Sequence, residues 1–224
     1  MTELDAVDMM INDLMPAEPR GTLTKKPYKP VKEKIQSKVF KTNLKKVMRK
    51  GKSEANLFEL FGGGLEIGTS YHVISGGDID SLSFLQVVLN EQKLNYCLFS
   101  TWCMAMADIE MIEKWLCDKH IKKLDAYVGE IFPNSYGKEW EKLKDVMKRY
   151  GGRVCVFRNH AKIYAGTGSK FSFAIESSAN INTNPRAENT CLTLSKELYG
   201  FYKDFFDGIN SFNRDFDDWT PYDN

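Results

Sequence analysis

The run from Leu94 to Trp102 places apolar residues at successive positions instead of alternating them with polar ones. A strand with this pattern is typical of a sheet that is covered on both faces. Other strand-like and helix-like runs alternate along residues 65–212; Tyr71–Ser75 reads as a strand, for example, and Ala107–Asp118 as a helix. The sequence therefore predicts an α/β fold, with a layered mixed β-sheet flanked by helices on both faces.

Charge divides the chain into segments, although its 31 Lys and Arg nearly balance its 30 Asp and Glu. Five acids and no base occur before residue 20, thirteen Lys or Arg and one acid follow up to residue 52, and six Asp and one Arg occur after residue 203. Such segregation often marks interaction segments. We predict four parts: an acidic amphipathic N-terminal segment (1–19), an extended basic arm (20–64), an α/β domain (65–212) and an acidic C-terminal tail (213–224).

Each N-terminal part has two interpretations. The acidic segment 1–19 carries apolar residues at helical spacing, so it is either a short helix packed on its own domain or a peptide that docks on a protein partner. Within the basic arm, residues 31–52 add apolar residues that could form a basic amphipathic helix. This stretch is either a solvated tail or a contact for the phosphate backbone of nucleic acid, because clustered Lys and Arg release counterions there. Lys45 and Lys46 are its candidate substrate-binding residues.

The cysteines and the N-terminus bear on the cellular compartment. The five cysteines are odd in number and scattered, without Cys-x-x-Cys pairs or zinc-site spacing, so we expect small core residues in a reducing compartment. The chain starts with acidic residues rather than a secretory signal. No run approaches the roughly 20 apolar residues that a membrane span needs. These features predict a cytoplasmic protein without membrane association.

The candidate functional site consists of three groups of residues in chain order: His160 and Lys162, then Ser177–Asn180, then Glu188. The residues between the first two groups read as a strand, a Gly-rich turn and a second strand, so a hairpin would bring Asn180 back towards the first pair. Residues two apart on a strand point to the same face, so we expect His160 and Lys162 to project together. An imidazole, an ammonium and an amide on one surface suit a phosphate ester.

In these residues the chain resembles the phospholipase D superfamily, specifically members with one copy of the motif, which include small nucleases. That family carries His-x-Lys, a short hairpin, Gly-Ser-x-Asn and a Glu before a further strand. The resemblance covers roughly residues 65–210 in element order and is specific from 153 to 194. Thr167 stands where the family has an Asp, and Ser177 where it has a Gly. The hairpin is longer than usual, and the Asn-to-Glu loop is shorter.

The resemblance implies a role for each residue of the motif. His160 would attack phosphorus and form a phosphohistidine intermediate. Glu188 would hydrogen-bond the other ring nitrogen and stabilise the imidazolium. Lys162 and Asn180 would bind the non-bridging oxygens. No metal or other cofactor is expected, because side chains supply the positive charge.

Further residues are expected to bind substrate: Ser177 and Ser178 through their hydroxyls, and Thr101 by lining the groove. One motif supplies only half of a site, because a two-step displacement also needs a group that protonates the leaving oxygen and later activates water. We therefore expect a symmetric homodimer in which the His160 of each subunit faces the other.

Our first hypothesis is a metal-independent phosphodiesterase, a nuclease acting on DNA or RNA, because the basic arm favours a polyanionic substrate. The alternative is a catalytically degenerate member that binds nucleic acid or acts as a scaffold in an assembly. A phospholipid-processing enzyme is a weaker third interpretation, because no apolar membrane-docking stretch is present.

Overall fold

The computed structural model describes residues 55, 57–61, 64–76, 79–182 and 186–223. The acidic segment 1–19 and most of the basic arm, including Lys45 and Lys46, lie outside the described residues.

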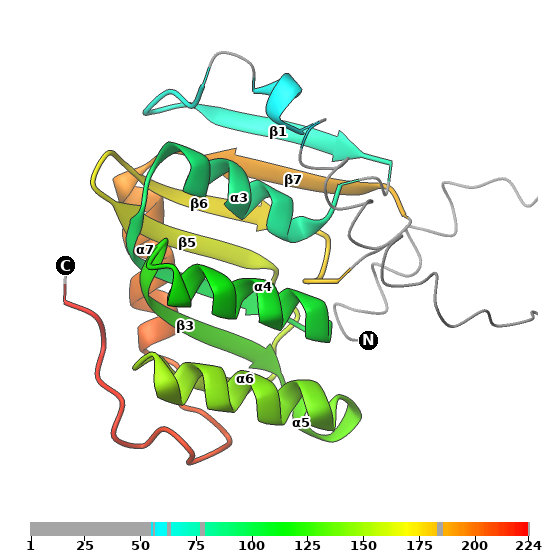
Figure 1. Ribbon diagram of the computed structural model, residues 1–224, viewed down its shortest axis with the longest axis vertical. Helices are drawn as coiled ribbons and strands as arrows, with labels where there is room; N and C mark the ends of the chain where they lie inside the picture. The colour runs from blue at the N-terminus through cyan, green and yellow to red at the C-terminus, as the bar shows by residue number, and fades with distance from the viewer. Residues whose placement is uncertain (1–54, 56, 62–63, 77–78, 183–185, 224) are drawn as a thin grey trace, which may run out of the picture. The chain divides into compact units, whose positions relative to one another are not determined.

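Seven strands form one mixed sheet in the order β1-β7-β6-β5-β2-β3-β4 (Figure 1). The strands are β1 (Ser70–Ser75), β2 (Leu94–Thr101), β3 (Ile121–Gly129), β4 (Val154–Phe157), β5 (Ile163–Gly168), β6 (Ser172–Ser177) and β7 (Glu188–Thr193). Strands β2, β3 and β4 are parallel, whereas the remaining pairings are antiparallel. The first of these strands in the chain therefore pairs with the last.

Helices cover both faces of the sheet, as the apolar run of β2 predicted (Figure 1). On one face lie α3 (Ser81–Glu91), α4 (Met106–Cys117) and α6 (Gly137–Arg149), the last preceded by the short α5 (Phe132–Ser135); α7 (Lys196–Asp207) lies on the other. The sheet has a hydrophobic core on each face, and successive residues of β2 pack into opposite cores. Phe99 belongs to the core under α3, α4 and α6, and Leu98 belongs to the core under α7. Among the described residues, no helix is long and apolar enough to span a membrane.

The core extends upstream of residue 65, where we expected the domain to begin. Leu57 and Phe61 are buried in the core under α3, α4 and α6. The ring of Phe61 meets that of Tyr71 on β1 edge-on, with 5.1 Å between centroids. The last residues of the arm that we assigned to 20–64 are thus part of the folded domain.

Residues 213–223 pack against the domain, although their acidic composition suggested a tail. Phe216 packs against the core under α3, α4 and α6, and Tyr222 against the core under α7. The Trp219 indole nitrogen donates a hydrogen bond to buried Asp125 at 3.0 Å, and the Tyr222 ring stacks on that of Tyr96 with 4.8 Å between centroids. The aromatic residues between the aspartates explain why this segment packs on the domain, because burial of their apolar rings is energetically favourable.

The candidate site lies at one edge of the sheet, where the parallel strands β2, β3 and β4 end; we call it the carboxyl edge. Strand β5 begins there, since Ile163 pairs with Ser100. Strand β6 ends there and β7 begins there, since Ser177 pairs with Thr190. The carboxyl ends of strands are the usual location of binding residues in open α/β sheets.

Candidate functional site

Asn159 anchors the short connection between β4 and β5 that carries His160. Its side chain is buried, and its amide nitrogen donates to Ser100 Oγ at 2.9 Å and to the carbonyl oxygens of Thr101 and Tyr127 at 3.2 and 3.1 Å. Its Oδ1 accepts from the backbone amide of Ala161 at 2.9 Å, which closes an Asx turn around His160. Sequence reasoning missed Asn159, although an Asn directly before the His in a short connection is a signal for such a turn.

His160 and Lys162 project together, as their spacing predicted, but they lie just ahead of β5 rather than on it. The Lys162 ammonium is 2.6 Å from the His160 carbonyl oxygen, 3.0 Å from Nδ1 and 3.3 Å from Nε2. Because an ammonium can only donate, a ring nitrogen that it hydrogen-bonds must carry a lone pair. A nucleophilic imidazole needs that same lone pair.

Lys162 is buried, with 7% of its surface exposed, whereas His160 is exposed. Burial lowers the pKa of Lys162 below its ordinary value, and the nearby Cys103 and Glu188 partly offset that effect. The carboxylate of Glu188 is therefore close enough to act on the ammonium. A poorly hydrated ammonium interacts more strongly with an anion than one in bulk water does.

Thr101 holds the segment after β6 in place. It is fully buried, and its Oγ1 donates to the carbonyl oxygen of Cys103 at 2.8 Å and accepts from the amide of Ile181 at 3.2 Å. This hydroxyl is already used in two hydrogen bonds. The expectation that Thr101 lines a substrate groove is therefore wrong; it positions the chain next to Asn180 instead.

Asn180 follows β6 and returns to the carboxyl edge, as the predicted hairpin required. The amide of Ser177 donates to the carbonyl oxygen of Lys162 at 2.9 Å, which brings the end of β6 beside the Lys. The Oδ1 atom of Asn180 is buried and has no hydrogen-bond partner within the part of the chain that the structure describes. An unsatisfied buried polar group costs about 1–3 kcal/mol, and because Oδ1 is an acceptor, the partner that it lacks is a hydrogen-bond donor.

Ser178 and Glu188 are hydrogen-bonded to each other through the Ser178 hydroxyl and a carboxylate oxygen. The same hydroxyl accepts from the backbone amide of Asn189 at 3.1 Å. Ser177 is used differently, because its Oγ is 2.8 Å from that of Thr190 and accepts from the amide of Ala179 at 3.1 Å. Ser178 thus orients the carboxylate of Glu188, whereas Ser177 braces the end of β6.

Thr167, which stands in place of the family's Asp, is remote from these residues. It lies at the other end of β5, five residues after Lys162, or about 16 Å away at the rise of an extended strand. Its hydroxyl is 2.8 Å from that of Ser172 across the hairpin. A carboxylate at position 167 could not reach the carboxyl edge, so its replacement removes no group from the candidate site.

Trp102 lies directly after β2, beside His160. The two ring centroids are 5.8 Å apart with planes inclined by 52°. Gly129 is required here, because a Cβ at that position would come within 2.7 Å of the Trp102 ring. The indole is therefore held close to the end of β3 and next to His160, while remaining only partly buried.

Lys45 and Lys46 cannot be placed relative to these side chains, because both lie outside the described residues. Within the described part of the chain, no group of three or more His, Cys, Asp and Glu side chains gathers as around a metal ion.

No protein-family model and no curated protein sequence matches this chain. Solved structures do resemble it. The polyphosphate kinase from Porphyromonas gingivalis has a TM-score of 0.48 and 16% identity, and the match covers 65% of this chain and 27% of that one. NucT from Helicobacter pylori has a TM-score of 0.45 and 15% identity, and the match covers 62% of this chain and 94% of NucT. Phosphatidylserine synthase from Haemophilus influenzae has a TM-score of 0.45 and 13% identity, and the match covers 61% of this chain and 37% of the synthase.

Proposed function

We propose that this chain is a phosphodiesterase of the phospholipase D type, a metal-independent nuclease with His160 as nucleophile. The observation that carries the proposal is the contact between the Lys162 ammonium and the His160 ring at the carboxyl edge. Glu188 acts electrostatically on the same ammonium, and Asn180 follows β6, whose end lies beside Lys162. These are the groups that in-line attack on a phosphodiester requires.

In the first step, a ring nitrogen of His160 forms a bond to phosphorus while the bond from phosphorus to the leaving oxygen breaks. Lys162 moves from the imidazole to a non-bridging oxygen, where its charge is stabilising as negative charge develops. Asn180 donates its amide N–H to the same phosphoryl group. Glu188, oriented by Ser178, stabilises the imidazolium. Water then cleaves the bond between nitrogen and phosphorus and restores the free imidazole.

The leaving oxygen must receive a proton, and the water must lose one. We propose that His160 of a second subunit performs both transfers across a two-fold axis. One imidazole is then neutral while the other is protonated.

Nucleic acid is the substrate that we favour. The thirteen basic residues between positions 20 and 52 suit a polyanionic chain. The partly exposed indole of Trp102 next to His160 suits a nucleobase, because aromatic side chains stack on bases without regard to sequence.

The test is cleavage of single-stranded and duplex DNA and RNA in excess EDTA by the full chain and two variants. We expect the wild type to cut at least one substrate and His160→Ala to be inactive. His120→Ala is the matched control, because His120-Ile121-Lys122 repeats the His-x-Lys spacing at the start of β3, and it should keep full activity. Salt-sensitive binding without cleavage would instead support the non-catalytic alternative.

The shared site has its own test. Light scattering should give a dimer, and specific activity should fall when the enzyme is diluted below the dissociation constant of that dimer. A monomer with unchanged specific activity at high dilution would refute the second-subunit acid.

A further inference from the structure

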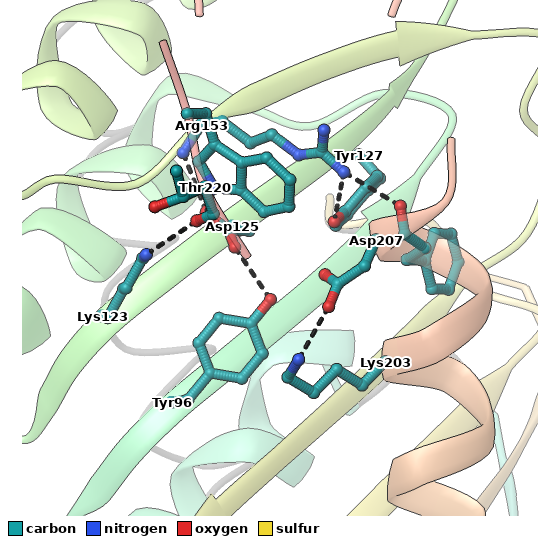
Figure 2. Close-up of polar contacts among 10 residues, drawn as sticks. Tyr96, Lys123, Asp125, Tyr127, Arg153, Lys203, Asp207 and Thr220 are labelled. Carbon is teal, nitrogen blue, oxygen red and sulfur yellow. Dashed lines mark hydrogen bonds and ion pairs between the residues drawn. The ribbon is translucent and has the colours of Figure 1, made fainter. Parts of the chain in front are cut away.

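The buried guanidinium of Arg153 lies on the face of the sheet that α7 covers (Figure 2). The Arg153 guanidinium lies 3.5 Å from the Trp219 ring centroid, and its Nη2 donates to the Tyr127 hydroxyl and the Phe206 carbonyl oxygen, each at 2.9 Å. Its Nε is buried and has no hydrogen-bond partner among the residues that the structure describes. Among the described residues, Arg153 forms no ion pair with a carboxylate.

The neighbouring carboxylate, Asp125, is already satisfied by other donors. Its oxygens accept from the Tyr96 hydroxyl at 2.8 Å, the backbone amide of Arg153 at 2.9 Å and the Trp219 indole at 3.0 Å (Figure 2). The guanidinium makes none of these bonds. A buried charge normally has an opposite charge or a complete set of hydrogen bonds, and Arg153 has neither.

Asp207, at the end of α7, is a second incompletely paired residue, and its charge is opposite to that of Arg153. One of its oxygens pairs with the Lys203 ammonium at 2.7 Å, and the other, Oδ1, is buried and has no hydrogen-bond partner in the described part of the chain. Arg153 and Asp207 line the same pocket of about 320 Å³, which also involves Asn210, Asn213, Asp217 and Trp219. This pocket includes none of the candidate catalytic residues.

The charges on the pocket wall restrict what it can hold. A simple anion would be attracted by Arg153 but repelled by Asp207 and Asp217. A simple cation would meet the opposite conflict at the guanidinium. A molecule with both charges avoids both conflicts, and about 300 Å³ is the lower end of the usual size of small-molecule pockets.

We propose that this pocket binds a small zwitterion, a free α-amino acid, with its carboxylate on Arg153 and its ammonium between Asp207 and Asp217. The carboxylate accepts from the guanidinium, and the ammonium is attracted by the charge of Asp207 and donates to the exposed carboxylate of Asp217. Asn210 and Asn213 supply further polar contacts, and Trp219 supplies an apolar wall.

Isothermal titration calorimetry of the full chain tests the proposal, with the standard L-amino acids added singly and with acetate and methylammonium as probes that carry one charge each. We expect at least one amino acid to bind about tenfold or more tightly than either half-probe, since each half-probe lacks the charge-assisted hydrogen bonds of the other charged group. Absence of binding by every amino acid, or equal binding of acetate, would overturn the proposal.

Matched variants locate the binding. Asp217 and Asp218 are both exposed, and only Asp217 lines the pocket. Asp217→Asn should weaken amino-acid binding about tenfold, and Asp218→Asn should leave it unchanged. Arg153→Lys, which keeps the charge and loses the planar donor set, should also weaken binding; circular dichroism checks its folding. Equal affinities of the two Asp variants would refute the site even if Arg153→Lys failed to fold.

Discussion

Lys162 donates a hydrogen bond to the backbone carbonyl oxygen of His160, 2.6 Å away, while its ammonium also lies against the imidazole of that same residue. The backbone contact ties the ammonium to the turn that carries the nucleophile, so one short segment positions both groups.

We expect Lys162→Ala to lower kcat/KM for a phosphodiester by about 10²–10³, the usual cost of removing one donor that stabilises transition-state charge. Steady-state kinetics measures the loss. Lys170→Ala is the control, because Lys170 is an exposed Lys in the turn between β5 and β6, at the opposite end of the sheet from the carboxyl edge. Comparable losses in the two variants would mean that general surface charge, rather than the Lys162 contact, drives activity.

Asn159→Ala should destabilise the fold and lower activity together, because its amide joins the ends of β2 and β3 to the turn that carries His160. Each buried partner left unsatisfied costs about 1–3 kcal/mol. Urea unfolding should therefore show a lower midpoint than for the wild type. The exposed Asn134 provides the control, and Asn134→Ala should be neutral. A stable but inactive Asn159→Ala would limit its role to orienting His160.

Trp102→Ala should weaken binding of single-stranded oligonucleotides by about 1–3 kcal/mol, the usual contribution of one base stacked on an aromatic ring. Fluorescence anisotropy with a labelled oligonucleotide measures this directly and does not depend on turnover. Trp102→Phe keeps an aromatic face and should retain most of the affinity. The stacking role fails if the Ala and Phe variants bind equally well.

Trp219→Ala should lower the free energy of unfolding by about 2 kcal/mol or more, because it removes a packed ring, a cation–π contact and a hydrogen bond. Phe212→Ala provides a comparison directly before the C-terminal segment 213–223, since Phe212 is 64% exposed. That variant should change stability by less than about 0.5 kcal/mol. Similar effects at both positions would argue against a structural role for the packed C-terminal segment.

Stability should also depend on pH through Asp125. Burial raises the pKa of this carboxyl, and hydrogen bonds from Tyr96, the backbone of Arg153 and Trp219 oppose the rise. The folded state then keeps a proton that the unfolded chain, with a pKa of about 3.9, has lost. The stabilisation from this proton is therefore complete below about pH 3.9 and is lost as pH rises through the folded pKa.

Asp125→Asn cannot titrate at this position, so it isolates the effect. The wild-type free energy of unfolding minus that of Asp125→Asn should fall as pH rises across this window. Urea denaturation of both proteins at a series of pH values measures the difference. A difference that is constant or rises with pH would show that the pKa of Asp125 is not raised in the folded state.

Local sequence patterns predicted much of the fold. The apolar run of β2 correctly predicted a sheet covered on both faces, because burial of every side chain needs a core on each side. His160 and Lys162 do project together, although both precede β5 and the prediction had placed them on a strand. The hairpin correctly predicted the return of the chain towards Lys162, because a strand, a turn and a strand are local in sequence.

Other features depend on contacts between residues far apart in the chain. The pairing of β1 with β7 joins segments more than a hundred residues apart, and no local pattern encodes it. Thr101 looked accessible at a strand end, yet its hydroxyl is bonded to Cys103 and to Ile181, which follows β6. Residues 213–223 are acidic overall, which suggested a tail, but their aromatic side chains pack on the sheet.

The amino-acid sequence by itself determined the layered architecture, the hairpin and the residue types of the candidate site, since periodicity and spacing act over a few residues. Only the tertiary structure decided which polar groups face one another at the carboxyl edge and which are buried without partners. The physical reason is that a hydrogen bond depends on the distance and direction between two atoms, and for residues on different strands those quantities are set by how the whole sheet is assembled.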